Sequence, residues 1–325
     1  MITVLGAGSI GVAFAAVFSD MGVDVTIVEP NAQRRGEVDQ GLRQQDDAIW
    51  AADLWRGGQG KVDVVAEADG HVAMADLVLE CGPEKLDVKQ AIFADLLEKA
   101  GEHTLLATAS SAITISQIVP DNANQARCLV AHPVNPPSVL RVIELVPAPG
   151  TDAQAMARAG LLFEQAGFHP VQLGKEIEGF VLNRLQGAVL REAYRLVADG
   201  VSDVAGVEAI VRLGLGPRWA LSGPFETAEL NTPGGIMAHA QRMGPAYKRM
   251  GEARGETVDW NDELVATVAA QCRAQLPEDA IPARAAWRAK AVAELVAQRN
   301  ILMQQPQLPE IEVANPIDTN DNEHD

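Results

Sequence analysis

The stretch Ile2–Glu29 (ITVLGAGSIGVAFAAVFSDMGVDVTIVE) decides the fold of this chain. It begins with the apolar run Ile2–Leu5, continues at once with Gly6–Gly11 (GAGSIG), and then becomes a helical run that ends near Gly22. A second apolar run comes next and is closed by Glu29. This order of strand, GxGxxG, helix, strand and acidic residue is the context in which the glycine motif marks a dinucleotide-binding fold. The chain is therefore expected to begin with a doubly wound α/β domain.

Each glycine of the motif has a physical task in such a fold. Gly6 permits the tight turn, Gly8 lets the backbone approach a pyrophosphate, and Gly11 allows the helix to pack closely on the strand. The unpaired N–H groups at the start of the helix then face the phosphates. Glu29 can accept hydrogen bonds from the adenosine ribose hydroxyls and would repel a 2′-phosphate, which favours NAD over NADP. The alternative is a glycine-rich turn without a ligand.

The composition is that of a globular protein with room for two domains. The chain has 325 residues, of which 47% are hydrophobic and 22% are charged, and single cores stop growing near ~250–300 residues. Its formal net charge of −18 argues against nucleic acids and anionic membranes as partners. No apolar run approaches the ~20 residues of a membrane span. A small acid held by one or two basic side chains is compatible with this charge.

The cysteines and histidines give no sign of disulfides or metal sites. The three cysteines, Cys81, Cys128 and Cys272, are odd in number and far apart, which favours a reducing compartment, and we expect the cytoplasm. The chain opens directly on a strand, without a basic, cleavable leader. The six histidines lack the spacing of an HExxH site, and no GxSxG elbow or Walker loop occurs. We therefore expect no metal, and hydrolase and phosphoryl-transfer chemistry are disfavoured.

A second informative stretch, Ala131–Pro137 (AHPVNPP), carries the candidate acid/base group His132. Apolar runs on either side, Cys128–Ala131 and Val142–Val146, are typical of buried strands, and the second contains Glu144. A charge inside such a run needs a partner, because burying it unpaired is costly. The imidazole 12 residues earlier could be that partner if the strands lie side by side, which would leave one ring nitrogen for a substrate proton. A core histidine beside a structural glutamate is the alternative.

The rest of the first half alternates between strands and helices. Further strands are expected at 62–65, 77–80, 104–108 and 170–173, and helices at 88–100 and 152–166. Glu84 and Lys89 come after the second of these strands, where a doubly wound sheet presents its ligand edge, although solvated surface charges are the alternative. Ser110 and Ser111 come after the third strand, where a hydroxyl could cap the segment from Thr114 or bond a substrate oxygen. Residues 31–60 are expected to form a solvated helix and a loop.

From Gly179 onward the apolar pattern has helical periodicity. Phe180 and later apolar residues up to Val197 repeat at three- and four-residue steps, and Asn183 lies on an adjoining line with Gly187. A buried amide needs partners, which a neighbouring loop or a ligand could supply. Further helices are expected at 204–213, 236–252, 262–275 and 283–304. Residues 306–325, with prolines and many acidic residues, are expected to form a disordered acidic tail.

Several phrases of the sequence together resemble the 3-hydroxyacyl-CoA dehydrogenase superfamily, most closely its lambda-crystallin and L-gulonate 3-dehydrogenase branch. They are the glycine motif, Val130–Pro137, Val142–Pro147, Gly179–Gln186, Gly214–Trp219 and Ala283–Arg288. The similarity runs from residue 1 to about residue 300, with a poor match at 31–75. It implies a Rossmann NAD-binding domain over 1–175, a helical substrate and dimerisation domain over 176–305, and NAD-linked oxidation of a secondary alcohol by a homodimer.

The resemblance also implies roles for individual residues. The family's acid/base pair falls on His132 and Glu144, its helix asparagine on Asn183, and its serine on Ser111, with Ser110 as the alternative one position earlier. Its NAD contacts fall on Gly6, Gly8, Ser9, Ile10, Gly11, Glu29, Glu84 and Lys89. An aspartate is more usual at the position of Glu29, whose longer side chain keeps the charge.

These residues predict that the protein oxidises a 3-hydroxy acid to the 3-keto acid with NAD as the hydride acceptor. His132 would take the hydroxyl proton, Glu144 would hold the ring, and Ser111 and Asn183 would bond the reacting oxygen. Arg218 could pair a free carboxylate in bidentate fashion, which suits a small acid such as L-gulonate, although pairing with a surface acid is the alternative. A CoA thioester, L-carnitine, and a non-catalytic, crystallin-like NAD-binding protein are the other interpretations.

Overall fold

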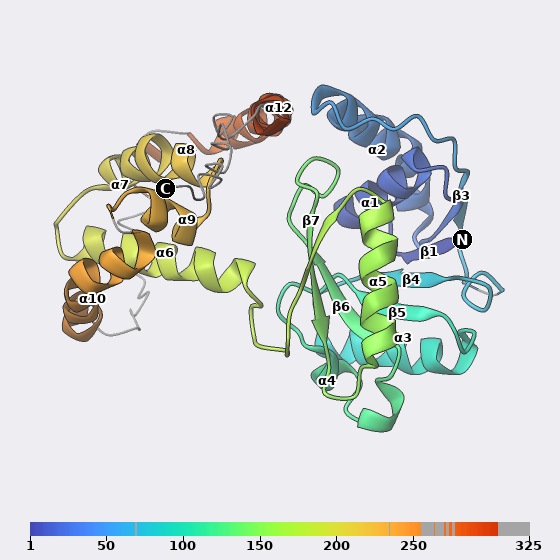
Figure 1. Ribbon diagram of the computed structural model, residues 1–325. Helices are drawn as coiled ribbons and strands as arrows, with labels where there is room; N and C mark the ends of the chain where they lie inside the picture. The colour runs from blue at the N-terminus through green and yellow to red at the C-terminus, as the bar shows by residue number, and fades with distance from the viewer. Residues whose placement is uncertain are drawn as a thin grey trace, which may run out of the picture.

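The computed structural model describes residues 1–68, 70–233, 235–254 and 277–304, together with the single positions 263, 270, 273 and 274. The described residues form an α/β lobe followed by a helical lobe (Figure 1). The predicted acidic tail 306–325 and Cys272 lie outside the described residues, as does the predicted helix 262–275 apart from those four positions.

A sheet of eight strands forms the centre of the α/β lobe, in the order β3-β2-β1-β4-β5-β6-β7-β8. Its strands are β1 (Ile2–Leu5), β2 (Val25–Val28), β3 (Val62–Val65), β4 (Leu77–Glu80), β5 (Leu105–Thr108), β6 (Cys128–Pro133), β7 (Val142–Pro147) and β8 (His169–Gln172). All neighbours are parallel except β6 and β7, which are antiparallel. The order of the strands reverses between β1 and β4: β2 and β3 follow β1 on one side, and β4 and β5 lie on the other side. Open α/β sheets bind ligands at such a switch point. The predicted fold class is confirmed.

Helices cover both faces of this sheet (Figure 1). They are α1 (Ser9–Asp20), α2 (Ala32–Ala51), α3 (Leu86–Lys99), α4 (Ile115–Ile118) and α5 (Ala153–Gln165), with a 3₁₀ turn η1 (Asn122–Asn124). Successive strand residues point to opposite faces, so Leu77 and Leu79 join the core under α1 and α5, while Val78 joins the core under α3 and α4. Phe163 fills the first core and Phe93 the second. Between these two helix layers, the carboxyl ends of β1 to β6 lie at one rim of the sheet, whereas β7 and β8 run the opposite way.

The helical lobe begins with α6 and continues through short helical segments. Its elements are α6 (Leu182–Ala198), α7 (Val204–Ile210), the π-helical η2 (Val211–Leu215), α8 (Gly216–Trp219), α9 (Pro224–Leu230), α10 (Gly235–Arg254), the 3₁₀ turn η3 (Glu278–Ala280) and α12 (Ile281–Gln304). The segments α8 and α9 were not among the predicted helices. The sequence pattern also predicted a helix from Gly179 with a buried stripe, and this is wrong in two respects: the helix begins at Leu182, and none of its residues is buried. Its apolar stripe finds no covering layer among the described residues of a single chain.

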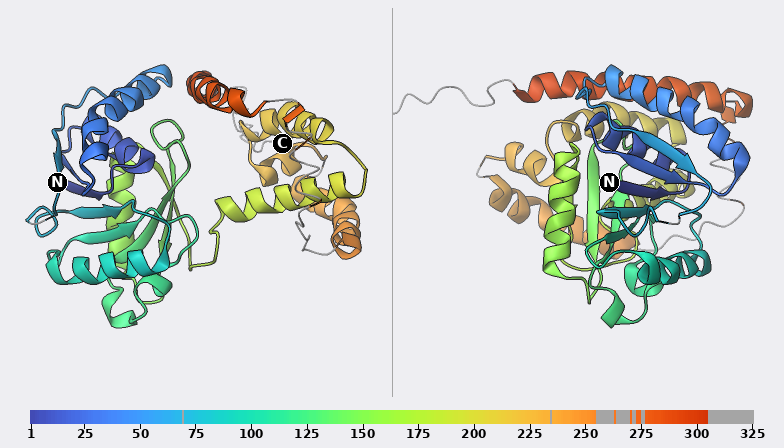
Figure 2. Two further views of the ribbon diagram at one scale, coloured as in Figure 1. Left: turned by 180° about the vertical axis from the view of Figure 1, so that it is seen from behind. Right: turned by 90° about the vertical axis from the view of Figure 1, so that its right-hand side faces the viewer.

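The last helix returns to the α/β lobe and packs on α2 (Figure 2). Ala293 of α12 is buried in a small apolar cluster with Ala52, just after α2, and Val139, between β6 and β7. Within the described residues this cluster joins the two lobes, in addition to the chain segment that leads into α6.

Candidate active site

The sheet register places His132 directly opposite Glu144 on the antiparallel strands β6 and β7. The Nδ1 atom of His132 lies 2.7 Å from Oε2 of Glu144, and the two residues are 5% and 3% exposed. The expected contact between the two side chains is therefore present. Among the described residues only Nδ1 of the ring has a hydrogen-bond partner, so Nε2 is the nitrogen available for a proton from outside the protein.

The second oxygen of Glu144 binds the start of α6. Oε1 accepts hydrogen bonds from the backbone N–H of Val181 at 2.7 Å and of Leu182 at 3.0 Å. Burial disfavours the charged form of Glu144, but the hydrogen bond with His132 and these two amides outweigh it and lower the pKa of the carboxyl. Glu144 therefore stays a carboxylate near neutral pH, and it holds both the imidazole and a helix end.

Asn183, the second residue of α6, brings the loop after β5 to the same place. Its Nδ2 donates a hydrogen bond of 2.8 Å to the backbone oxygen of Ser111. Ser111 is exposed and its side chain has no hydrogen bond within the described part of the chain. Ser110 is buried, and its hydroxyl donates to Oε1 of Glu84 at 2.6 Å. The two serines thus have different surroundings: one hydroxyl is engaged by the protein and the other faces outward.

A buried ion pair that sequence reasoning missed lies beneath this loop. Lys89 and Glu80 are 1% and 0% exposed, and Nζ of Lys89 lies 2.8 Å from Oε2 of Glu80. Glu80 also accepts hydrogen bonds from the hydroxyl of Thr108 at 2.6 Å and the backbone N–H of Gly82 at 2.7 Å. The interpretation of Lys89 as a solvated surface charge is therefore wrong. The sequence feature that could have indicated this buried pair is Glu80 itself, a charged residue at the end of the apolar run Leu77–Glu80.

The same lysine reaches the exposed carboxylate of Glu84 at 3.4 Å. Glu84 also accepts the backbone N–H of Ser111 at 2.9 Å. Its partial burial raises the pKa of Glu84, but the Ser110 hydroxyl, the Lys89 charge and the Ser111 amide together lower it more. A charged Glu84 therefore ties the Ser110–Ser111 turn to the buried pair.

The glycine motif borders a cavity of about 1100 Å³ at the carboxyl ends of β1, β2 and β4. Gly6 has a φ of +106°, a conformation that side chains disfavour. A Cβ at Gly11 would collide with the carbonyl oxygen of Gly6, whereas a Cβ at Gly8 would meet nothing within 4 Å. Ser9 and Ile10 come next as the first residues of α1. The loop is thus tightly folded yet open to an approaching ligand, as a pyrophosphate requires.

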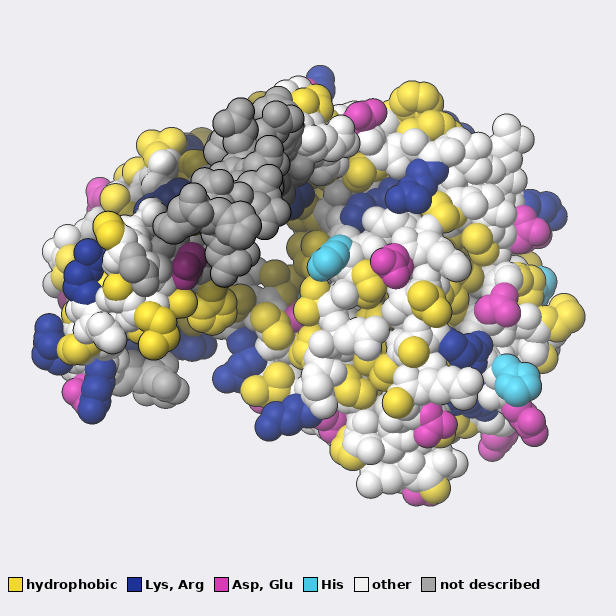
Figure 3. All heavy atoms as spheres, in the orientation of Figure 1, with side chains coloured by type: hydrophobic (Ala, Val, Ile, Leu, Met, Phe, Trp, Pro, Cys, Tyr) yellow, Lys and Arg dark blue, Asp and Glu magenta, His cyan; other side chains and the backbone are white. Residues whose placement is uncertain are grey.

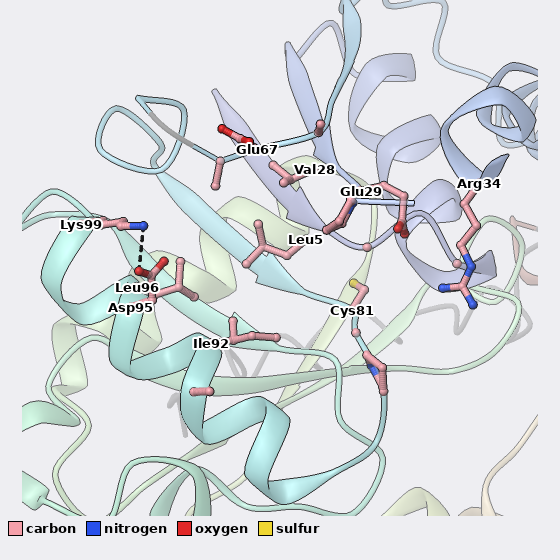
Figure 4. Close-up of a pocket in the computed structure, with 18 residues that line it drawn as sticks. Leu5, Val28, Glu29, Arg34, Glu67, Cys81, Ile92, Asp95, Leu96 and Lys99 are labelled. Carbon is pink, nitrogen blue, oxygen red and sulfur yellow. Dashed lines mark ion pairs between the residues drawn. The ribbon is translucent and has the colours of Figure 1, made fainter. Parts of the chain in front are cut away.

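Glu29 lies in this cavity, at the end of β2 (Figure 4). Its Oε2 accepts the backbone N–H of Ala7 at 3.0 Å and its Oε1 that of Asn31 at 2.8 Å. A carboxylate offers about four lone-pair sites, so it keeps acceptor capacity for ribose hydroxyls. Arg34 lines the same cavity (Figure 4), although its segment was expected to be a solvated helix.

The structure does not bring Arg218 into contact with the other predicted site residues among those it describes. It lies in α8 of the helical lobe (Figure 1), and its Nε donates to the backbone oxygen of Gly214 at 3.1 Å. Within the described residues, no hydrogen bond or ion pair joins its side chain to His132 or Asn183.

The described residues contain neither a metal-binding cluster nor a membrane-spanning helix. No group of three or more His, Cys, Asp or Glu side chains there is arranged to hold a metal ion. Among the helices in that part of the chain, none combines the length and the apolar character that crossing a membrane would take.

Comparison with known families covers most of the chain. Residues 1–177 match the family described as 3-hydroxyacyl-CoA dehydrogenase, NAD binding domain, and residues 179–268 match 3-hydroxyacyl-CoA dehydrogenase, C-terminal domain.

Individual known proteins are similar over nearly the whole length. The lambda-crystallin homolog of Bos taurus is 32% identical over 311 residues, which cover 93% of this chain and 97% of that protein. An L-carnitine dehydrogenase of Streptomyces griseus is 32% identical over 305 residues, 92% of this chain and 86% of that protein. Among solved structures, 5-formyl-3-hydroxy-2-methylpyridine 4-carboxylic acid 5-dehydrogenase, an NAD⁺-dependent dismutase, has a TM-score of 0.76 at 25% identity, covering 94% of this chain and 99% of that chain.

Proposed function

Because the chain belongs to the 3-hydroxyacyl-CoA dehydrogenase family and carries its NAD-binding domain, we propose that it oxidises a small 3-hydroxy acid, of the L-gulonate type, to the 3-keto acid. The observation that carries the proposal is the buried imidazole of His132, held at Nδ1 by Glu144 at 2.7 Å with Nε2 unengaged within the described chain. An oriented imidazole with one free nitrogen is the usual general base for a secondary alcohol.

We assign the steps of the proposed reaction to the residues around His132. NAD supplies the hydride acceptor when it is bound. His132 takes the proton of the substrate hydroxyl at Nε2, and Glu144 keeps the ring in one orientation and stabilises the imidazolium that forms. Asn183 and Ser111 are proposed to hydrogen-bond the reacting oxygen, which sets the carbinol carbon in line for transfer. Their mutual contact supports a joint role.

The cavity at the glycine motif suits the adenosine and pyrophosphate portions of NAD. The tight turn at Gly6 and the open backbone at Gly8 fit the pyrophosphate, and the free acceptor sites of Glu29 fit ribose hydroxyls. We place the start of α1, at Ser9 and Ile10, against the phosphates. The exposed Glu84 is proposed to face the nicotinamide ribose, and the buried Lys89 to support Glu84 through the contact of its Nζ with that carboxylate.

The choice of a small free acid rests on charge and on the relatives. A net charge of −18 disfavours a substrate with the several phosphates of CoA. The relatives include lambda-crystallin homologs, L-carnitine dehydrogenases and a 3-hydroxyacyl-CoA dehydrogenase, so L-carnitine and CoA thioesters are the competing substrates. A non-catalytic NAD-binding protein of the crystallin type is the competing function, and the assembled His132–Glu144 pair argues against it.

A substrate panel tests the proposal directly. Purified protein is incubated with NAD and L-gulonate, L-carnitine, 3-hydroxybutyrate or 3-hydroxybutyryl-CoA, and NADH is followed at its absorbance near ~340 nm. The proposal expects the highest kcat/KM with a free hydroxy acid. Preference for the CoA thioester would overturn the substrate class, and NAD binding without turnover of any compound would favour the non-catalytic alternative.

We propose Arg218 as the ligand of the substrate carboxylate, because its guanidinium has no acidic partner among the described residues. Arg218→Met should raise the KM of the best free acid by about tenfold or more, as expected for a lost charge-assisted pair, and should change kcat little. Arg212, an arginine of η2 that is also exposed, provides the matched control, and Arg212→Met should leave KM within about twofold. An unchanged KM in Arg218→Met would remove this residue from the site.

We further propose that the helical lobe pairs with a second copy of the chain. Large apolar side chains stand exposed along α7 to α9 (Figure 3). One of them, Phe225, is 81% exposed, and monomeric proteins rarely leave such a surface uncovered. Sedimentation should give twice the mass of one chain, and Phe225→Glu should shift the protein toward the monomer. Met74→Glu, an exposed apolar residue of the α/β lobe, is the control. A monomeric wild-type protein at micromolar concentration would contradict the proposal.

The proposed compartment is the cytoplasm. Cys81 and Cys128 are free thiols in the structure, as expected where thiols are kept reduced.

A further inference from the structure

The chain enters the helical lobe through two consecutive residues in the left-handed conformation. Gly179 has a φ of +75° and Phe180 a φ of +50°. The first is ordinary for glycine, but a bulky aromatic residue with positive φ is an outlier that the surrounding structure must enforce. Such strained residues concentrate at functional sites, so the contacts that enforce the conformation of Phe180 are informative.

The side chain of Phe180 is anchored in the core of the α/β lobe. It is 0% exposed and packs in the cluster that also contains Phe93, Val130 and Val146. Val130 and Val146 belong to the strands that carry His132 and Glu144. Phe180, just before α6, is therefore fixed to the strands that carry His132 and Glu144.

The ring of Phe180 also contacts the imidazole of His132. The two ring centroids lie 5.4 Å apart with an interplanar angle of 54°, which is within the range of favourable aromatic contacts. Because His132 and Glu144 are themselves nearly buried, an apolar ring beside them keeps water away from their hydrogen bond. It also restricts rotation of the imidazole about its side-chain bonds.

The backbone of the turn performs a second task. Directly after Phe180, the N–H groups of Val181 and Leu182 bind Oε1 of Glu144, and the next residue, Asn183, binds the loop at Ser111. A right-handed residue at position 180 would send the chain in another direction, and these donors would no longer meet their acceptors. This one turn thus positions both the carboxylate of Glu144, which holds His132, and the side-chain amide of Asn183, which is proposed to bind substrate.

We propose that Phe180 is a positioning residue for the dehydrogenase reaction: its ring fixes the His132 imidazole, and its left-handed backbone aims α6 at Glu144 and Ser111. It touches neither substrate nor cofactor in this proposal and acts through His132, Glu144 and Asn183. The inference rests on the proposed function for its kinetic readout, so a second readout is needed that does not require turnover.

The side-chain test compares Phe180→Leu with Phe163→Leu. Both phenylalanines are fully buried, but Phe163 lies in the other core, under α1 and α5, and makes no ring contact with His132 among the described pairs. Phe180→Leu should lower kcat by at least about tenfold while the Kd of NAD stays within about twofold. Both variants should lower Tm by a similar amount, but Phe163→Leu should leave kcat within about twofold. Equal kcat losses in both, or none in Phe180→Leu, would overturn the proposal.

The backbone test adds a methyl group to the turn while keeping the ring. A Cβ at Gly179 would meet no atom closer than 3.6 Å, so Gly179→Ala challenges only the positive φ. It should lower kcat or raise the substrate KM by about tenfold. Gly174→Ala, in the same connecting segment with open space around its Cβ, is the matched control and should behave as the wild type. Wild-type kinetics in Gly179→Ala would remove the backbone part of the proposal.

The readout without turnover is the ¹⁵N spectrum of the histidine rings in the enzyme without substrate. The wild type should show His132 held as one tautomer with its proton on Nδ1 toward Glu144, and Phe180→Leu should show averaging of the two ring nitrogens. Phe163→Leu should resemble the wild type. An unchanged His132 signal in Phe180→Leu would overturn the inference, whereas absence of turnover in the wild type would count against the proposed function alone.

Discussion

Replacement of His132 by alanine is expected to lower kcat for the best hydroxy acid by about 10²- to 10⁴-fold, the range that general bases contribute. The Kd of NAD should stay within about twofold, because the cavity at the glycine motif is lined by residues at the ends of β1 and β2, just after β4 and along α3, and His132 is not among them. The loss should appear in the hydride-transfer step itself, since the alcohol proton then has no acceptor at Nε2.

Single-turnover kinetics with NADH absorbance measure that step apart from product release. His169→Ala, an exposed histidine of β8, is the control for loss of an imidazole elsewhere and should keep kcat within about twofold. An enzyme with wild-type kcat after His132→Ala would end the assignment of the base.

The second large effect concerns the buried pair of Lys89 and Glu80. Lys89→Met leaves a carboxylate unpaired at 0% exposure, and Glu80→Gln leaves the ammonium at 1% exposure with only the more distant Glu84. Removing one partner of a buried pair typically costs about 3–5 kcal/mol of unfolding free energy. The double variant, which leaves no unpaired buried charge, should recover most of that loss.

Urea denaturation of the four proteins measures this cycle. Asp95→Asn, which breaks a half-exposed pair with Lys99, is the control and should cost less than about 1 kcal/mol. In the double variant we expect stability to recover but kcat/KM to stay low, because Glu84 and the Ser110–Ser111 turn have lost the lysine that holds them. Losses that simply add in the double variant would contradict the buried-pair explanation.

The parts that sequence predicted correctly are those set by short-range patterns. The glycine motif and its flanking strands fold within Ile2–Glu29, so their context is complete in the sequence. The meeting of His132 with Glu144 needed only the assumption that two apolar runs pair as neighbours, and the antiparallel register satisfies it.

The parts that sequence missed depend on residues brought together from distant elements. Glu80 is bound by Lys89 from α3 and Thr108 from β5. No local sequence pattern predicts these contacts. Phe180 fitted the helical periodicity of the residues after it, yet its ring belongs to the core of the other lobe and pulls the backbone out of the helix. The apolar stripe of α6 was predicted as buried, but a single chain leaves it uncovered.

The antiparallel pairing of β6 and β7 has a consequence for redesign. Side chains alternate between the two sides of a strand, so a slip of one residue would send Glu144 away from His132. The pairing runs from Leu129 with Pro147 to Pro133 with Ile143, and in a hairpin the length of the connection, here residues 134–141, helps to fix that register. Val139 of this connection is also buried against Ala52 and Ala293. Insertions or grafted loops there are therefore expected to shift the strands and separate Glu144 from His132, whereas substitutions that keep the loop length and Val139 should preserve the alignment.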